Sequence, residues 1–180
     1  MDVGLELLTD PTETVSVRSV CRRSGLVARY FYENFTDRDA LVDAVFDATV
    51  ERIATSTIAA VDLPESTPEQ RIRAGISNIV DVVGDNPRLG ALLFATELAE
   101  PRLAERRAQS TKFFAALLAD QARTQLHADP SDRIDLTTTF VVGGFAQVLA
   151  EWIADEMSVP RTELVEHCHQ LFVRLAPGPP

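Results

Sequence analysis

Apolar residues recur at spacings of three and four along most of this 180-residue chain, and no segment alternates apolar and polar residues at period two. Spacings of three and four are typical of amphipathic helices, whereas alternation at period two indicates strands. Prolines and glycines fall between the periodic segments, where helices begin and end. The pattern therefore predicts an all-α protein with eight or nine helices.

Capping residues predict several of the helix boundaries. Thr36, with Asp39 three residues later, predicts the start of a helix from 37 to about 60. The sequence Thr-Pro-Glu-Gln at 67–70 combines a cap, a proline at the first helical position and a glutamine at the third, so a helix should start there and end near 83. Further helices are predicted over 86–98, 101–126, 129–157 and 160–176.

The most specific local signal lies between residues 16 and 35. Ser16 can cap a short helix over 17–24, and residues 27–35 predict a second helix with Phe31 and Phe35 on its inner face. Gly25 stands where a tight turn needs positive φ, and Leu26 is expected to point back into that turn. Such a pair forms a helix-turn-helix, whose second helix commonly enters the DNA major groove. The pattern alone leaves open a plain helical hairpin with a solvated basic face.

The charge distribution favours this segment as a polyanion-binding face. The chain carries a net charge of −10, but residues 17–38 hold five arginines against two acidic residues, a net +3. The remaining residues therefore sum to −13, which should repel polyanions from the rest of the surface. On the second helix Arg29 can reach guanine edges or phosphate, while the hydroxyl and amide groups nearby can contact phosphate. Arg38 begins the next helix, where backbone N–H groups add to an anion site.

Residues 16–41 resemble the DNA-binding domain of the TetR family of repressors. The resemblance rests on Ser16-Val17-Arg18-Ser19-Val20, on Ser24-Gly25-Leu26 and on the run from Tyr30 to Leu41. Within that run the Tyr32-x-x-Phe35 pair, the basic residue Arg38 and Leu41 fall at the family's signature spacing. Beyond residue 46 the resemblance is architectural only, a helical bundle of the right length.

The resemblance implies that the chain has two domains with different functions. Residues 1–46 would form a three-helix DNA-binding domain, and residues 47–180 a helical ligand-binding and dimerisation domain. In the family, residues matching Tyr32, Asn34 and Arg38 touch phosphates, and the helix matching 27–35 reads bases. The expected DNA-contacting residues are Ser16, Arg18, Val27, Ala28, Arg29, Tyr30, Tyr32, Asn34 and Arg38.

Two features depart from the family's pattern. Val27 stands where the family usually has a serine or threonine cap, and a missing cap costs a helix about 1 kcal/mol. Met1 falls inside the family's first helix, which normally has about ten more residues before it. We therefore expect either a start codon further upstream or a short acidic first helix.

The family's second domain encloses a ligand cavity, and aromatic and polar positions of the central helices are the candidates for its lining. Plain core packing is the alternative for each of them, because most helical apolar stripes are core. The candidates are Leu92, Leu93, Phe94, Thr96, Phe113, Phe114, Leu117, Phe140 and Gln147.

In the family, the last two long helices of each subunit pack as a four-helix dimer interface. Residues 132–157 and 160–176 match those helices. The adjacent glycines Gly143 and Gly144 would permit close backbone approach there, or would accommodate a bulky residue within the subunit. The expected seam comprises Phe145, Leu149, Trp152, Leu164, Leu171 and Phe172.

The chain offers no positive evidence for catalysis, a metal or a cofactor. His167, Cys168 and His169 cannot converge on one ion, because neighbouring residues of a helix point apart, and we expect two exposed histidines beside a buried thiol. No glycine-rich phosphate loop and no nucleophile paired with a histidine motif is present. Residues 136–150, the longest uncharged apolar stretch, are too few and too polar to span a bilayer.

These observations together predict a cytoplasmic homodimeric repressor that binds a palindromic double-stranded operator and is released by a small-molecule effector. The two cysteines fit a reducing cytoplasm, and no export signal is visible. A small-molecule-binding helical dimer with impaired DNA binding is the first rival, favoured by the start of the chain, by Val27 and by the net charge. A helical-bundle enzyme is the second rival, without a catalytic constellation to support it.

Overall fold

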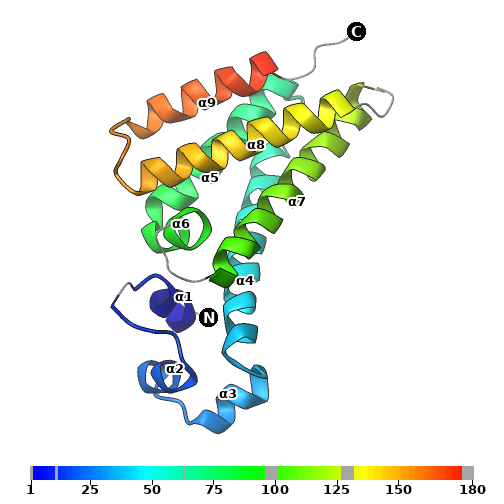
Figure 1. The fold of residues 1–180 in the computed structure, drawn as a ribbon. Helices are drawn as coiled ribbons and strands as arrows, with labels where there is room; N and C mark the ends of the chain where they lie inside the picture. The colour runs from blue at the N-terminus through cyan, green and yellow to red at the C-terminus, as the bar shows by residue number, and fades with distance from the viewer. Residues whose placement is uncertain (1, 11, 63, 96–100, 127–131, 176–180) are drawn as a thin grey trace.

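The structure is a computed structural model that describes residues 2–10, 12–62, 64–95, 101–126 and 132–175. These residues form nine α-helices with their connecting turns, and they contain no strand. The prediction of an all-α protein is confirmed (Figure 1). The helices are α1 (Asp2–Leu8), α2 (Val17–Ser24), α3 (Ala28–Asn34), α4 (Arg38–Val61), α5 (Pro68–Asp85), α6 (Pro87–Phe94), α7 (Pro101–Leu126), α8 (Asp132–Ile153) and α9 (Arg161–Leu175).

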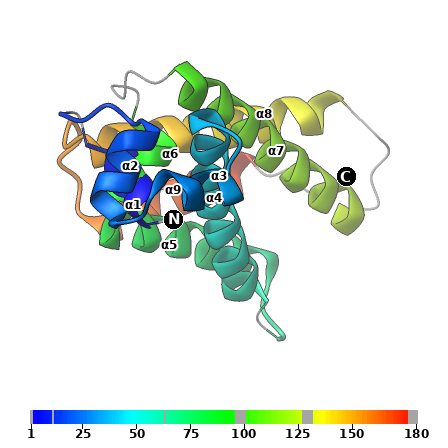
Figure 2. The ribbon, with the colours of Figure 1, turned by 90° about the horizontal axis from the view of Figure 1, so that it is seen from below.

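The helices α1 to α3 form a small unit at one end of the molecule, and α5 to α9 form a bundle at the other (Figure 1). The 24 residues of α4 connect the two without a break, so residue 46, the predicted domain boundary, lies inside one continuous helix. Seen from below, the small unit lies under α6 and the near end of α4, while α7 and α8 extend to one side (Figure 2).

One hydrophobic core runs through both units. Leu7 and Phe31 of the small unit belong to the same cluster as Phe46 of α4 and Leu92 of α6. Because α4 contributes buried residues to both ends of this cluster, the small unit is docked on the bundle by apolar packing. The direction in which α2 and α3 face is therefore fixed by the bundle.

The cap of α5 was predicted correctly, whereas the cap of α4 was not. The Thr67 hydroxyl accepts from the Gln70 N–H at 3.2 Å, and the Gln70 side chain accepts from the Thr67 N–H at 2.8 Å. At α4 the N-cap is Asp37 instead of Thr36, since the Asp37 carboxylate accepts from the Ala40 N–H at 2.8 Å. A carboxylate also complements the positive end of the helix dipole, which a hydroxyl does not.

Three predicted helix ends also need correction. The helix α5 continues through Gly84 to Asp85 instead of stopping at 83, and α8 ends at Ile153 instead of 157. The chain leaves α8 through a turn in which Asp155 has positive φ, and the Trp152 indole donates to the Val159 carbonyl at 2.9 Å. The helix α6 ends at Phe94 with Ala95 as its extended C-cap, and residues 96–98 of its predicted extent lie outside the described residues.

Candidate nucleic-acid interface

The turn between α2 and α3 has the predicted backbone conformation, but the side chain of Leu26 does not point into it. Ser16 caps α2 by accepting from the Ser19 N–H at 3.0 Å, and the Ser19 hydroxyl accepts from the Ser16 N–H at 2.9 Å. Gly25 follows with φ of 71°, the left-handed conformation that its lack of a β-carbon allows. The prediction that Leu26 plugs the turn is wrong, because its side chain is exposed and its N–H donates to the Ser24 hydroxyl at 3.3 Å.

The helix α3 presents one buried face and one exposed face. Phe31 is buried and its ring lies 5.5 Å from that of Phe35, so this face of the helix joins the hydrophobic core. The side chains of Arg29, Tyr30 and Tyr32 are more than half exposed on the other side. The prediction that these three point outward is confirmed.

Val27 is the N-cap of α3, with an extended backbone and no side-chain bond to the helix. Its side chain is 61% exposed, so it packs against little of the molecule. Ala28, the first residue of α3, is exposed as well. The predicted departure from the family's capped helix is therefore present in the structure.

The other predicted DNA-contacting residues are already engaged to different degrees. Arg18 is exposed on α2, whereas the Ser16 hydroxyl serves as the cap of that helix. The Asn34 amide donates to the Tyr30 carbonyl at 2.9 Å within its own helix. Arg38 is half-buried and donates from Nε to the Val15 carbonyl at 3.1 Å.

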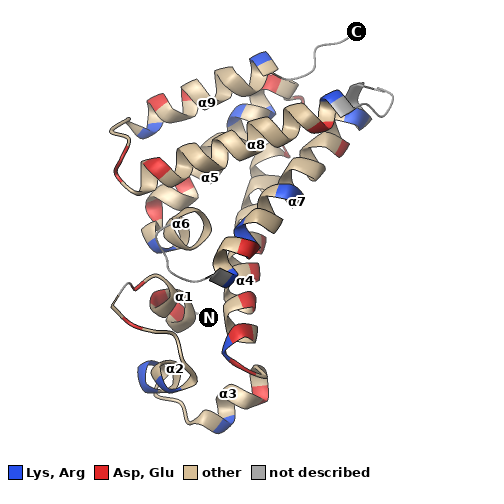
Figure 3. Ribbon diagram, in the orientation of Figure 1, with Lys and Arg blue, Asp and Glu red and all other residues tan. Residues whose placement is uncertain are grey.

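Carboxylates pair with the arginines of this basic segment. Figure 3 shows the arginines on α2 and α3, with acidic residues on α1 and on the adjoining part of α4. Arg29 donates to Glu33 at 2.9 Å one turn along α3, and Arg38 donates to Asp39 at 2.8 Å. Each is a surface pair of small energy, about 1 kcal/mol or less. Phosphates of a nucleic acid would have to compete with these partners.

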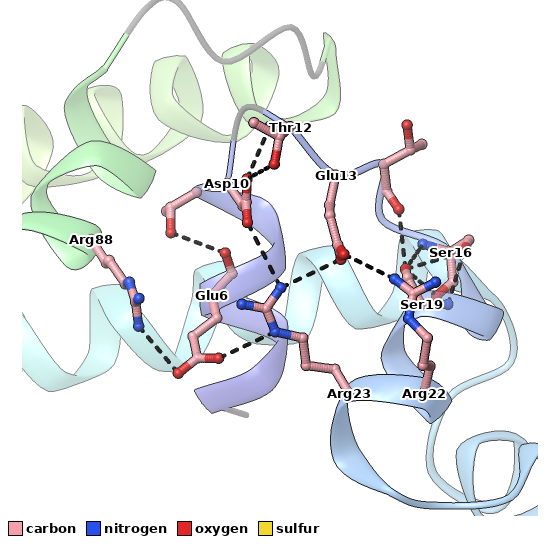
Figure 4. Close-up of polar contacts among 11 residues, drawn as sticks. Glu6, Asp10, Thr12, Glu13, Ser16, Ser19, Arg22, Arg23 and Arg88 are labelled. Atoms are coloured by element: carbon pink, nitrogen blue, oxygen red, sulfur yellow. Dashed lines mark hydrogen bonds and ion pairs between the residues drawn. The ribbon is translucent and has the colours of Figure 1, made fainter.

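A larger cluster joins α2 to α1 and α6 (Figure 4). The Arg23 guanidinium lies 3.8 Å from the Glu6 carboxylate, 3.7 Å from Asp10 and 3.5 Å from Glu13. The other oxygen of Glu6 accepts from Arg88 of α6 at 3.1 Å. Glu6 therefore links α6 of the bundle to α2 of the small unit.

The same cluster holds the segment between α1 and α2 in place. Glu13 also accepts from Arg22 at 2.9 Å. Hydrogen bonds from the Thr12 hydroxyl and N–H, followed by the nearby Arg23, hold the pKa of Asp10 below its usual value. The Asp10 carboxylate therefore stays charged at neutral pH. Together with Glu13 it contacts Arg23 in the last turn of α2 (Figure 4).

A second set of ion pairs joins α7 to α4. Arg102 donates from Nε to Asp43 at 2.8 Å and pairs through a second nitrogen with the other oxygen of that carboxylate. Arg106 pairs with Asp47 and lies over the Phe46 ring at 5.5 Å from its centroid. Hydrogen bonding to Arg102 lowers the pKa of Asp43, and the same contact raises the pKa of Arg102.

The sequence contains a signal for this second set that none of the predictions above used. Asp39, Asp43 and Asp47 recur every four residues on α4, and Arg102 and Arg106 have the same spacing on α7. Residues four apart lie on one face of a helix, so each set forms a stripe of one charge. Two complementary stripes indicate that the helices pack against each other.

The structure does not gather the predicted ligand-pocket residues in one enclosed space. Three of them belong to the core or pack against it, one is partly buried on α7, four are exposed on α7 and α8, and Thr96 lies outside the described residues. Two surface hollows, of about 200 Å³ beside Asp43 and Arg102 and about 340 Å³ beside Ile72 and Val173, contain none of them. The three core residues are Leu92, Leu93 and Phe94, the partly buried residue is Phe114, and the exposed four are Phe113, Leu117, Phe140 and Gln147.

The residues predicted for the dimer interface also divide into buried and exposed ones. Leu149 and Leu164 are 1% and 3% exposed, so they belong to the core of the subunit itself and offer no surface to a partner. Phe145 and Phe172 pack edge to face with ring centroids 5.5 Å apart. Leu171 is 54% exposed. Of the predicted residues, only this last one is a large exposed apolar side chain.

A different set of residues makes an exposed apolar face on α8. Leu136 and Phe140 are largely exposed, the latter at 69%. A β-carbon at Gly143 or Gly144 would have nothing within 4 Å, so these glycines do not accommodate a bulky residue within the described subunit. Among the described residues, helix 133–153 alone is long and apolar enough to cross a membrane by length and composition, and 11% of its most apolar window is buried.

The adjacent histidines and cysteine of α9 point in different directions, as predicted. His167 is exposed, Cys168 is buried, and burial raises the pKa of its thiol. The expectation that both histidines are exposed is wrong for His169, which is buried with Nε2 3.8 Å from the Glu69 carboxylate. The packing of α9 against α5 covers that side chain.

Comparisons with known proteins identify the fold. No family model matches the chain, and no curated protein is significantly similar to it. A putative TetR-family transcriptional regulator from Syntrophomonas wolfei superposes with a TM-score of 0.79 at 14% identity, covering 98% of this chain and 92% of that one. The fatty acid degradation regulator FadR from Bacillus halodurans gives 0.75 at 14% identity, covering 96% and 95%.

A third similar structure contains a ligand. FadR from Bacillus subtilis, a transcriptional regulator solved in complex with stearoyl-CoA, gives a TM-score of 0.72 at 11% identity, covering 97% of this chain and 95% of that one. Over nearly its whole length this chain therefore has the all-α fold of TetR-type and FadR regulators.

Proposed function

We propose that this chain, which has the fold of TetR-type regulators, is a DNA-binding transcriptional regulator that reads double-stranded DNA with α3. The observation that carries the proposal is the exposed face of α3, where Arg29, Tyr30 and Tyr32 stand opposite the buried Phe31. Arginine can bind guanine edges or phosphate, and tyrosine hydroxyls can bind phosphate. The acidic remainder of the protein directs a polyanion to this end of the molecule.

We propose that the active form is a homodimer joined through α8 and α9. The exposed apolar side chains Leu136 and Phe140 on α8 and Leu171 on α9 replace the buried Leu149 and Leu164 in the seam. A second copy suits this face because a two-fold axis pairs like surfaces, and the open space around the two glycines of α8 permits close approach. The same axis would place two copies of α3 about one turn of DNA, roughly 34 Å, apart on a palindromic operator.

The effector is proposed to be a small molecule that binds the bundle and favours a different spacing of the two recognition helices. A ligand shifts such an equilibrium only by binding one arrangement better than the other. Leu93 and Phe94 are among the predicted pocket residues that remain inside or beside the core. The similar FadR of Bacillus subtilis, solved with stearoyl-CoA, supports an effector with a long acyl chain in this fold.

Titration of the protein with the DNA upstream of its own gene tests the proposal. A repressor of this type retards a fragment of that DNA in a gel, gives a DNA affinity that falls steeply with salt, and sediments as a dimer. A protein that sediments as a dimer but binds no fragment at low salt is the ligand-binding dimer with impaired DNA binding. The pairing of the α2 and α3 arginines with carboxylates is the observation that favours this second function.

A further inference from the structure

Asp39 lies between Arg38, its neighbour at the start of α4, and Arg102 at the start of α7. Its Oδ1 atom accepts from Nη1 of Arg38 at 2.8 Å, and its Oδ2 atom lies 3.6 Å from Nη1 of Arg102. Arg38 and Asp39 belong to the first turn of α4, whereas Arg102 belongs to the first turn of α7. One carboxylate is therefore shared between two cations from segments that lie far apart in the sequence.

Both arginines have a second anchor, so neither depends on Asp39 for its position. Arg38 donates from Nε to the Val15 carbonyl at 3.1 Å, which ties it to the residue before the cap of α2. Arg102 holds Asp43 through two of its nitrogens and turns the third toward Asp39. A small movement of α7 along α4 would therefore change the distance from Arg102 to Asp39, and with it their attraction, while Arg38 stays anchored to the Val15 carbonyl.

We infer that Asp39 is a positioning residue that competes with DNA phosphate for Arg38, and that Arg102 sets the strength of this competition. The inference rests on the proposed function, in which Arg38 contacts phosphate. When Arg102 is close, it attracts the Asp39 carboxylate and weakens the ion pair between Asp39 and Arg38. Arg38 can then bind phosphate more strongly. When α7 moves off, Asp39 pairs with Arg38 alone and DNA affinity falls. The start of α7 thereby acts on the DNA-binding face without touching DNA.

The structure supplies charge-matched controls one and two turns further along the same helices. Asp47 carries the same charge as Asp39 on α4 but pairs with Arg106. Arg106 follows Arg102 by one turn of α7, and its carboxylate partners are Asp43 and Asp47. Substitutions at these two positions change the net charge equally and leave the contacts of Asp39 intact.

The test is a titration of the full-length protein with operator DNA over a series of salt concentrations. Asp39→Asn should tighten binding by about two- to fivefold, the effect of one surface ion pair. It should also steepen the dependence of log K on log salt by about 0.9, the slope of one further phosphate contact. Arg102→Gln should weaken binding by a similar factor and make the slope shallower. Asp47→Asn and Arg106→Gln should each stay within about twofold of the wild type.

Two further variants separate positioning from general charge effects and from misfolding. In an Arg38→Gln background, Asp39→Asn should no longer tighten binding, whereas a general charge effect would persist. With Asp39→Asn already present, Arg102→Gln should have no further effect, since the coupling passes through the missing carboxylate. Circular dichroism and thermal melting establish that each variant is folded before it is titrated.

The outcomes distinguish this inference from the proposed function. If the wild-type protein binds no operator, both are overturned. If it binds operator but Asp39→Asn behaves like Asp47→Asn, or Arg102→Gln like Arg106→Gln, the proposed function stands and Asp39 has no positioning role.

Discussion

The indole ring of Trp152 fills the space beside Gly84. A β-carbon at residue 84 would lie 2.9 Å from Cη2 of Trp152 and 2.5 Å from Nη2 of Arg161. Because the indole N–H is also bonded to the Val159 carbonyl, Trp152 fastens α8 to α5 and to the turn before α9 within one subunit. Its role in the predicted dimer seam is therefore at most a supporting one behind the exposed residues.

Gly84→Ala should destabilise the protein by up to about 2 kcal/mol, because overpacking a filled site costs about 1–3 kcal/mol and the higher helix propensity of alanine offsets about 1 kcal/mol of it. Either the indole or the Arg161 guanidinium must move, and the latter also pairs with Asp81 and Asp85. Urea unfolding followed by circular dichroism measures the change. A Gly84→Ala protein as stable as the wild type would show that α5 and α8 separate without cost.

Gly144→Ala should separate subunit stability from dimer stability. A β-carbon there meets nothing within the described subunit, and alanine favours a helix over glycine by about 1 kcal/mol. The same methyl group would hold two copies of α8 apart if they meet at this point. We expect a higher melting temperature for the isolated subunit and a weaker dimer by sedimentation equilibrium. An unchanged dimer constant would place the seam elsewhere.

Phe140→Glu and Leu171→Glu should each dissociate the dimer without unfolding the subunit. Both side chains are more than half exposed in one subunit, so a charge costs little there and is unfavourable only when a second copy covers it. Sedimentation velocity reports the dissociation, and far-ultraviolet circular dichroism reports the helix content. Leu149→Glu is the matched control, since a charge at that buried position should unfold the subunit.

Arg29→Ala and Tyr32→Phe should weaken operator binding by about 1–3 kcal/mol each and leave the fold intact. Both side chains are exposed on α3, and neither belongs to the hydrophobic core. Fluorescence anisotropy at fixed salt gives the affinities. Wild-type affinity in both variants would mean that α3 does not read the DNA.

Val27→Ser should stabilise α3 by up to about 1 kcal/mol, because a serine hydroxyl can accept from an N–H of the first turn. The backbone of Val27 is already extended, as an N-cap requires, and its exposed side chain gives up little packing. Thermal melting should show a modest rise, with DNA affinity equal or tighter. A lower melting temperature would mean that the valine side chain stabilises the turn more than a hydroxyl cap can.

The pair between Asp43 and Arg102 should make stability fall in acid. Because the pKa of Asp43 is lowered in the folded protein, its contribution is fully present above its unfolded value near 3.8 and is lost as the pH falls below that value. The contribution is about 1 kcal/mol or less, since the pair is partly exposed. Asp43→Asn should remove this part of the acid dependence in unfolding measured from pH 5 to pH 2. Glu51→Gln, at an exposed position of the same helix, is the control and should keep it.

The features that the sequence by itself determined are those that depend on local interactions. The helix at 17–24, the positive φ of Gly25 and the caps at Ser16 and Thr67 depend on residues within a few positions of one another, so their pattern suffices. The two faces of α3 follow in the same way, because Phe31 and Phe35 lie one turn apart. Where two caps compete locally, as at Thr36 and Asp37, the pattern did not separate them.

The tertiary structure decided which apolar face of α8 is buried and which charges meet. Leu136 and Leu149 are equally apolar, and periodicity assigns each to a face of the helix without saying which face meets the core. That choice depends on how α5, α6, α7 and α9 pack around α8. The partners Asp43 and Arg102 lie 59 residues apart, so their pairing exists only once α7 has folded back along α4. Contacts between distant segments depend on how the helices are arranged in space, and the spacing of residues within one segment carries no information on that arrangement.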